Sequence, residues 1–206
     1  EIDTLLTAPI NKDTIQSEEF NFPGHTEYLE QKFGVQDSLM FFVSDSLKIA
    51  LVTNHLPVSK IAQNITQEKI VRKLQLLNDS LKKDFMIVKP RIAVLALNPH
   101  AGDNGLLGDE EQNIILPAMK TAQQEHKIFC AGPFPADGFF GSTAMKSYDA
   151  VLAMYHDQAL APFKALLMDY GVNFTAGLPI VRTSPTHGTA YDKVGRNTAN
   201  ENSFRQ

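Results

Sequence analysis

Short apolar runs rich in valine, isoleucine, leucine and phenylalanine recur along the chain between longer polar stretches. These runs lack the strict alternation of apolar and polar residues that a sheet with one solvent-exposed face requires. They therefore predict strands that are buried on both faces. The predicted strands are residues 4–7, 40–43, 49–53, 92–97, 128–131, 150–154 and 178–181.

Two of the polar stretches predict helices. The apolar positions of residues 66–83 recur at the spacing of one helical face, at Ile70, Leu74, Leu77 and Leu81. Residues 109–126 begin with acidic side chains, which suit the positive end of a helix dipole, and Pro117 inside this stretch predicts a kink. Strands that alternate with helices favour an α/β sheet, in which ligands gather in the loops beyond the strand ends.

Composition narrows the classes of function. The chain has 206 residues and is 43% hydrophobic, so it can bury a substantial core, and its net charge of −4 argues against nucleic acid as a partner. Its apolar runs are much shorter than the roughly 20 residues that cross a bilayer, so we expect a soluble, cytoplasmic protein without membrane association. The single cysteine, Cys130, is expected in the core and fits a reducing compartment. Because the chain opens without methionine, we expect residues upstream of it.

Three of the six histidines share a pattern in which a turn or a strand end is followed at once by the imidazole. His25 follows a proline–glycine turn, whereas His100 and His156 follow predicted strands. Three neutral imidazoles with an open fourth position form a common catalytic metal site. Histidines in loops are mostly solvated or bonded to nearby backbone, however, and no local spacing such as HExxH ties these three together. His55 and His126 are interpreted only as a loop residue and a helix-end residue.

Several long motifs occur in order along the chain: FPGHTEYL, LNPHAGDNGLLGDEE, GPFPAD, DAVLAMYHDQ and GVNFTAGLPIVRTSPTHGTAYDKVGR. Together they closely resemble the 4-hydroxythreonine-4-phosphate dehydrogenase family of pyridoxal phosphate biosynthesis. The resemblance implies an α/β fold with an isocitrate/isopropylmalate dehydrogenase-like sheet flanked by helices, truncated here at the N-terminus and also at the C-terminus. Residues 1–180 would form the central α/β domain with the metal and substrate site and the dimer interface. Residues 181–206 would begin the C-terminal segment that returns to the nucleotide-binding domain.

The resemblance also assigns a metal site and a substrate site. It implies that one divalent ion, zinc, magnesium or cobalt, is bound by His25, His100 and His156. It implies that the phosphate and carboxylate of the substrate are bound by Lys164, Asn173 and Arg182. Each substrate residue also has an ordinary structural explanation, which is respectively a lysine stem along the core, a turn cap and a surface ion pair. Lys12 in TAPINK, which is similar to a motif of the family, is expected to face the same cleft.

Asp137 and Asp157 are candidate catalytic carboxylates near the metal, as proton acceptors or as partners of its ligands, although a helix N-cap and a turn residue are their ordinary roles. NAD or NADP is expected at the loop THGTAYDKVGR, which resembles the nucleotide loop of isocitrate dehydrogenases. The matching positions are His187, Gly188, Thr189 and Asp192. The glycines of LNPHAGDNGLLG are spaced GxxGxxG, so the Rossmann fingerprint GxGxxG is absent, in agreement with this resemblance.

The implied activity is the metal-dependent oxidation of 4-phosphooxy-L-threonine by NAD or NADP to 2-amino-3-oxo-4-phosphooxybutanoate, which decarboxylates to 3-amino-2-oxopropyl phosphate. The resemblance also implies a homodimer with the active site at the subunit interface, so the three histidines need not come from one copy. Two alternatives stay open. One is a related dehydrogenase of phosphorylated threonate or erythronate, and the other is a catalytically inactive metal-binding or dimerisation module.

Overall fold

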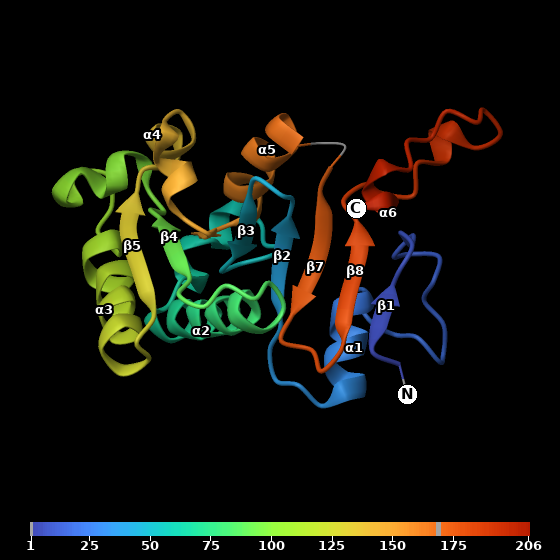
Figure 1. The fold of residues 1–206 in the computed structure, drawn as a ribbon, viewed down its shortest axis with the longest axis horizontal. Coiled ribbons are helices and arrows are strands. Elements are labelled where there is room, and N and C mark those ends of the chain that lie inside the picture. The colour runs from blue at the N-terminus through green and yellow to red at the C-terminus, as the bar shows by residue number, and fades with distance from the viewer. Residues whose placement is uncertain (1, 168–169) are drawn as a thin grey trace.

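A computed structural model describes residues 2–167 and 170–206. It contains a mixed eight-stranded sheet in the order β1-β8-β7-β2-β3-β6-β4-β5, with helices packed against it (Figure 1). The strands are β1 (Thr4–Leu6), β2 (Leu39–Val43), β3 (Lys48–Leu51), β4 (Arg91–Leu95), β5 (Phe129–Phe134), β6 (Ala150–Ala153), β7 (Val172–Ala176) and β8 (Val181–Pro185). The α-helices are α1 (His25–Phe33), α2 (Gln67–Lys83), α3 (Leu116–Glu125), α4 (Ala136–Phe140), α5 (His156–Leu167) and α6 (Asn202–Arg205). The predicted α/β class is confirmed.

Four neighbouring strands of the sheet run parallel to one another. β3 pairs in parallel with β6, β6 with β4, and β4 with β5. On the other side, β2 is antiparallel to both β3 and β7, while β8 is antiparallel to β7 and parallel to β1. Because the carboxyl ends of parallel strands meet at one edge of a sheet, the segments that follow β3, β6 and β4 start side by side.

The two faces of the sheet are covered by different helices. Neighbouring residues of a strand point to opposite faces, and on β2 these are Phe41 and Phe42. Phe41 belongs to a core that includes buried leucines and one isoleucine of α2 and small side chains of α3. Phe42 belongs to a second core with Phe139 of α4 and Phe163 of α5. Since both faces are buried there, the central strands β2, β3, β4 and β6 have apolar runs instead of an alternating pattern.

The helix predicted over residues 66–83 is confirmed as α2. Thr66 caps it, because the Thr66 hydroxyl accepts a hydrogen bond from the backbone N–H of Lys69 at 3.2 Å. The helix predicted over residues 109–126 is not uniform. It opens as a π-helical turn at Glu111–Ile115 and continues without a break as α3, so Pro117 lies directly after the π turn inside one continuous helical stretch. The wider π turn suits a proline that cannot donate to the preceding turn.

Six of the predicted strands match strands of the sheet, but the seventh is wrong. Residues 178–180 form no strand, and β8 begins only at Val181. The sequence analysis also missed β7, whose residues alternate between polar side chains, Asn173 and Thr175, and the buried Phe174 and Ala176. A search for purely apolar runs passes over such a strand. The predicted boundary after residue 180 falls between β7 and β8, which pair within one sheet.

Cys130 lies in the core as expected, with 2% of its surface exposed, and burial raises the pKa of its thiol to about 11. Within residues 2–167 and 170–206, no helix has both the length and the apolar character needed to span a membrane.

Leu74 of α2 is fully buried in the core that contains Phe41, so Leu74→Ala removes apolar contacts and leaves a cavity. We expect it to lower the free energy of unfolding by about 2–5 kcal/mol, measured by urea denaturation. Arg72→Ala on the exposed side of the same helix is the matched control and should change this quantity by less than about 0.5 kcal/mol. Equal effects of the two substitutions would contradict the assigned face of α2.

Candidate functional site

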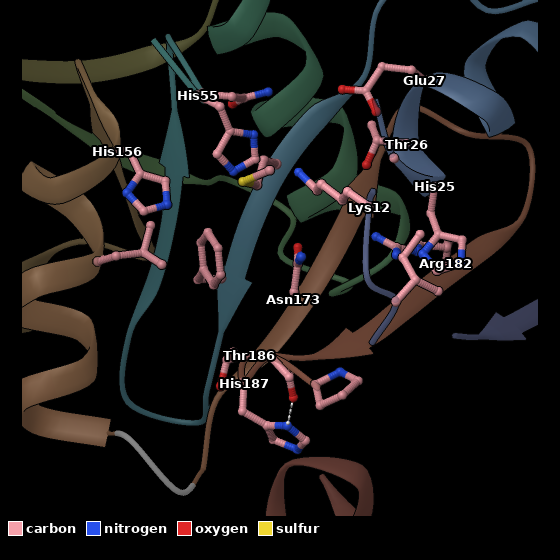
Figure 2. Close-up of a pocket in the computed structure, with 18 of the residues that line it drawn as sticks. Lys12, His25, Thr26, Glu27, His55, His156, Asn173, Arg182, Thr186 and His187 are labelled. Carbon is pink, nitrogen blue, oxygen red and sulfur yellow. Dashed lines mark hydrogen bonds between the residues drawn. The ribbon is translucent and has the colours of Figure 1, made fainter. Parts of the chain in front are cut away.

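A pocket opens among residues of α5, the start of α1, the strands β2, β7 and β8, and the segments after β1, β3 and β8 (Figure 2). Its volume is about 350 Å³, which suits a small ligand. Met40 and Phe42 of β2 and Leu160 of α5 give it apolar surface, and the rest of its lining is largely polar. The pocket therefore gathers residues that are up to 178 positions apart, from Ile10 to Gly188.

Positive charge predominates around this pocket. Lys12, Lys164 and Arg182 all line it, and Glu27 is the one carboxylate among its described lining residues. Asn173 lines it as well, so the three side chains expected to bind substrate and the expected neighbour Lys12 share one cavity. Such a balance of charge favours an anionic ligand.

Arg182 is the most deeply buried charge in the pocket, with 4% of its surface exposed. Its neighbour across the β7–β8 pair is Thr175, and its Nη1 donates to the Thr175 hydroxyl at 3.0 Å. Its Nη2 donates to the hydroxyl of Thr7 at 2.8 Å. Neither partner is a carboxylate, so the surface ion pair considered from sequence is not what holds this side chain. Burial lowers the pKa of Arg182.

Three buried side-chain atoms of residues that line the pocket have no hydrogen-bond partner among the described residues. They are Nε of Arg182, Oδ1 of Asn173 and Oδ1 of Asn54. Asn173 precedes Thr175 by two positions on β7, so both side chains point to the same face. An unpaired buried donor is costly, and one that lines a pocket is well placed to bind an oxygen of a ligand.

His55 and His156 lie together on the other side of the pocket, with ring centroids 5.5 Å apart (Figure 2). His156 is the first residue of α5 and follows β6, whereas His55 follows β3. The parallel pairing of β3 with β6 brings these two strand ends to one edge. Nδ1 of His156 lies 2.7 Å from Oδ1 of Asp157, an arrangement that orients the ring and leaves Nε2 available to a ligand.

The three histidines expected to bind a metal do not meet in this chain. His25 lies beside Arg182, across the pocket from His156 (Figure 2). His100 is exposed in the segment after β4 and does not line the pocket. Among residues 2–167 and 170–206, no three His, Cys, Asp or Glu side chains are grouped so that they could hold a metal ion. One copy of the chain does not bring His25, His100 and His156 together, so the metal site formed by these three residues stays a prediction.

His55 is the pocket residue that sequence reasoning passed over. The signal was present, because His55 follows the predicted strand 49–53 just as His156 follows the strand 150–154. His25 follows a turn and no strand. What the sequence could not supply is the strand order, which makes β3 and β6 neighbours.

The two candidate carboxylates differ in their surroundings. Asp157 contacts His156, as expected of a carboxylate that supports a ligand, but its own side chain is 83% exposed. Asp137 lies in the first turn of α4, is exposed and does not line the pocket. A direct role for Asp137 therefore finds no support in the pocket of this one chain.

Part of the expected nucleotide loop borders the same pocket. His187 and Gly188 line it, whereas Thr189 and Asp192 do not. His187 packs near Phe204 of α6, with ring centroids 5.8 Å apart, and its Nδ1 lies 2.9 Å from the carbonyl oxygen of Gly188. The start of the loop thus shares a pocket with Lys164, Asn173 and Arg182, the residues expected to bind substrate.

Two pocket histidines have pKa values below the ordinary one. For His55, burial is the largest cause, followed by the positive charges of Lys12 and His156, while Glu27 opposes them. For His25, burial acts first and the charge of Arg182 second. Both imidazoles are therefore held in the neutral form that binds metal ions or donates a hydrogen bond near neutral pH.

NMR titration should show His25 and His55 of the folded protein losing their protons below the ordinary value of about 6.5, which the urea-unfolded chain gives. Between the lowered pKa of the folded protein and the pKa of about 6.5 of the unfolded chain, the unfolded chain binds more protons. The contribution of the two neutral imidazoles to the free energy of unfolding is therefore present above about pH 6.5 and is lost as the pH falls. Lys12→Met should raise the pKa of His55 and leave that of His25 unchanged. Titration of His55 at or above its unfolded value would contradict the described surroundings.

Known proteins resemble the chain over its length. A family model described as pyridoxal phosphate biosynthetic protein PdxA matches residues 1–206. A curated relative from Bacteroides thetaiotaomicron, named 4-hydroxythreonine-4-phosphate dehydrogenase, is 61% identical over 100% of this chain and 56% of its own length. The crystal structure of 4-hydroxythreonine-4-phosphate dehydrogenase from Klebsiella pneumoniae aligns with a TM-score of 0.88 at 37% identity, over 98% of this chain and 61% of that one. The chain thus spans about six tenths of the length of these relatives.

A more distant likeness concerns the fold alone. Isocitrate dehydrogenase from Methylococcus capsulatus aligns with a TM-score of 0.57 at 9% identity, over 98% of this chain and 65% of that one. The isocitrate dehydrogenase-like fold expected from the motifs is confirmed. Since the family model matches every residue of the sequence, the chain belongs to the family of the pyridoxal phosphate biosynthetic protein PdxA.

Proposed function

We propose that the protein oxidises the secondary alcohol of 4-phosphooxy-L-threonine to 2-amino-3-oxo-4-phosphooxybutanoate, with NAD or NADP as hydride acceptor. This 3-oxo acid then loses carbon dioxide and gives 3-amino-2-oxopropyl phosphate, a precursor for pyridoxal phosphate. Family membership and the name of the Bacteroides relative support the reaction. The observation that carries the proposal is the buried Arg182, which lines the pocket together with two further cations and whose Nε has no hydrogen-bond partner among the described residues.

The substrate bears a phosphate, a carboxylate and an ammonium group, and the pocket offers partners for each. Arg182 and Lys164 are suited to the anionic groups, since a guanidinium binds two oxygens at once and an ammonium acts as a point charge. Asn173 next to Arg182 would accept or donate one more hydrogen bond. Glu27 suits the ammonium group, which favours an amino acid over the corresponding sugar acid.

A divalent ion fits the donors at His55 and His156 in this pocket. Two imidazoles side by side match the ligands of zinc and cobalt better than those of magnesium, which prefers oxygen. A third donor has to come from elsewhere, and the candidate is His100, in the segment that follows the neighbouring strand β4, from this chain or from a second copy. When bound, such an ion polarises the substrate oxygen and so favours loss of its proton. Asp157 keeps the His156 ring in the orientation that this requires.

NAD or NADP would bind at the loop that follows β8. His187 and Gly188 border the substrate residues, so the nicotinamide could lie against the alcohol carbon from this side. Thr189 and Asp192, further along the same loop, would bind the adenosine part of the nucleotide. The pocket is open, and we propose that a second copy of the protein closes it in a cytoplasmic homodimer.

A direct assay tests the proposal. The full-length protein is incubated with 4-phosphooxy-L-threonine, NAD or NADP and zinc, cobalt or magnesium, and the reduced nucleotide is followed by absorbance, with an EDTA-treated sample alongside. We expect the reduced nucleotide only when metal is present. Turnover of phosphorylated threonate or erythronate in preference would instead support the sugar-acid dehydrogenase, and metal binding without any turnover would support the inactive module.

Metal content separates the roles of the pocket histidines. His55→Ala and His156→Ala should each abolish stoichiometric binding of zinc or cobalt, measured by elemental analysis after dialysis. His25→Ala should retain the ion and raise the KM for the phosphorylated substrate, because His25 lies with Arg182. His126→Ala, an exposed histidine at the end of α3, serves as the control. Loss of metal in His25→Ala with retention in His55→Ala would reverse the assignment.

A further inference from the structure

The segment after β4 contains a left-handed turn. Six consecutive residues have positive φ angles, from 43° to 96°, namely His100, Ala101, Gly102, Asp103, Asn104 and Gly105. Side chains with a Cβ are disfavoured in this conformation, and only glycine adopts it freely. Four of these six residues are not glycine, so contacts from the rest of the fold must hold the turn in place.

The carboxylate of Glu111 lies beneath this turn and is almost completely buried, with 2% of the residue exposed. Oε1 accepts hydrogen bonds from the backbone N–H groups of Leu97 and Asn98, both at 2.8 Å. Oε2 accepts a third from the side-chain amide of Asn98 at 3.0 Å. All three donors belong to the two residues that lead from β4 into the turn. Among the described residues, Glu111 forms no ion pair, so these donors are what compensates its burial.

The turn also packs directly on this carboxylate. A Cβ added to Gly102 would lie 2.7 Å from Oε2 of Glu111 and 2.6 Å from the carbonyl oxygen of Gly108. The backbone N–H of Leu107 donates to the carbonyl oxygen of Gly102 at 3.0 Å and closes the turn. Glu111 therefore fixes the start of the turn by hydrogen bonds and its middle by contact.

Glu111 differs from its acidic neighbours. An acidic residue at the start of a helix usually lies in solvent and stabilises the helix dipole. Asp109 fits that description, because it is exposed and accepts a hydrogen bond from Asn113 one turn later. Glu111 is turned inward instead, onto the segment that carries His100.

We propose that Glu111 is a positioning residue that locks the left-handed turn and thereby sets the direction in which His100 presents its imidazole. The inference rests on the proposed function insofar as His100 serves as a metal ligand. Glu111 does not line the pocket, and its carboxylate is bonded to Leu97 and Asn98 at the start of the turn, so we expect it to act through the turn. The effect is pre-organisation, since a ligand that is already oriented loses less conformational entropy when it binds.

The test compares Glu111→Ala, Glu111→Gln and Asp109→Asn in the full-length protein. The first readout needs no metal and is the hydrogen exchange of the Leu97 and Asn98 amides, with the Val94 amide of β4 as internal reference. We expect exchange at least tenfold faster in Glu111→Ala. A smaller increase is expected in Glu111→Gln, whose carbonyl oxygen can still accept both backbone bonds while its NH₂ group opposes that of Asn98. Asp109→Asn should leave all three amides unchanged.

The second readout is the affinity for cobalt and the absorption spectrum of the bound ion. Loss of a residue that orients a ligand typically weakens metal binding by about 10–100-fold, and we expect this in Glu111→Ala with partial rescue in Glu111→Gln. The spectrum should change in the same order, whereas the KM for the phosphorylated substrate at saturating cobalt should stay within about twofold, because Arg182 and Lys164 are untouched.

Three results would overturn the inference. Unchanged exchange at Leu97 and Asn98 in Glu111→Ala would show that the carboxylate does not hold the turn. Faster exchange with unaltered cobalt affinity and spectrum would show that the turn does not orient His100. Equally faster exchange at Val94 would indicate general destabilisation, and if Glu111→Ala does not fold, the same comparison with Glu111→Gln decides. Absence of cobalt binding in the unaltered protein would instead contradict the proposed function, and the exchange experiment would still decide whether Glu111 holds the turn.

Discussion

The parallel pairing of β3, β6 and β4 is the constraint on which the site depends. It places three strand ends at one edge of the sheet, and a histidine follows each of them: His55, His156 and His100. The apolar residues of these strands are buried on both faces, so the register that aligns the strand ends is fixed by the two cores. The two buried cores thus hold the strand ends, and the histidines that follow them, in fixed relative positions.

Much of this architecture could be predicted from the sequence, since burial on both faces leaves a strong local signal. The apolar runs of β4 and β6 and the periodic leucines of α2 are examples. β7 escaped detection because Asn173 lines the pocket and Thr175 accepts a hydrogen bond from Arg182, and the polarity of these two residues interrupts the apolar pattern. The sites where pattern reasoning fails are those where a strand supplies ligand-binding side chains in addition to core packing.

The candidate site was predicted only in part, for a related reason. Motifs identified Lys164, Asn173 and Arg182, which the structure brings into one pocket, but they gave no spatial order to the histidines. The three-dimensional arrangement shows that the ring of His55 lies near that of His156. It also shows that His25 lies near Arg182 and not near His156. In the same way, Glu111 resembles an ordinary acidic residue at the start of a helix until its burial against the turn of His100 is seen. These relations are between residues distant in sequence, and no local pattern contains them.

The central claim is that the pocket at this sheet edge is a metal-assisted oxidation site in which His55 and His156 are neighbouring ligands. Crystals of the full-length protein grown with cobalt would test it most directly, through the anomalous scattering of the ion. The account predicts an anomalous peak within bonding distance of both imidazoles, about 2.0–2.1 Å from each nitrogen, as for zinc in protein sites. A peak bound by His25 without His55, or no peak in this pocket at saturating cobalt, would contradict it.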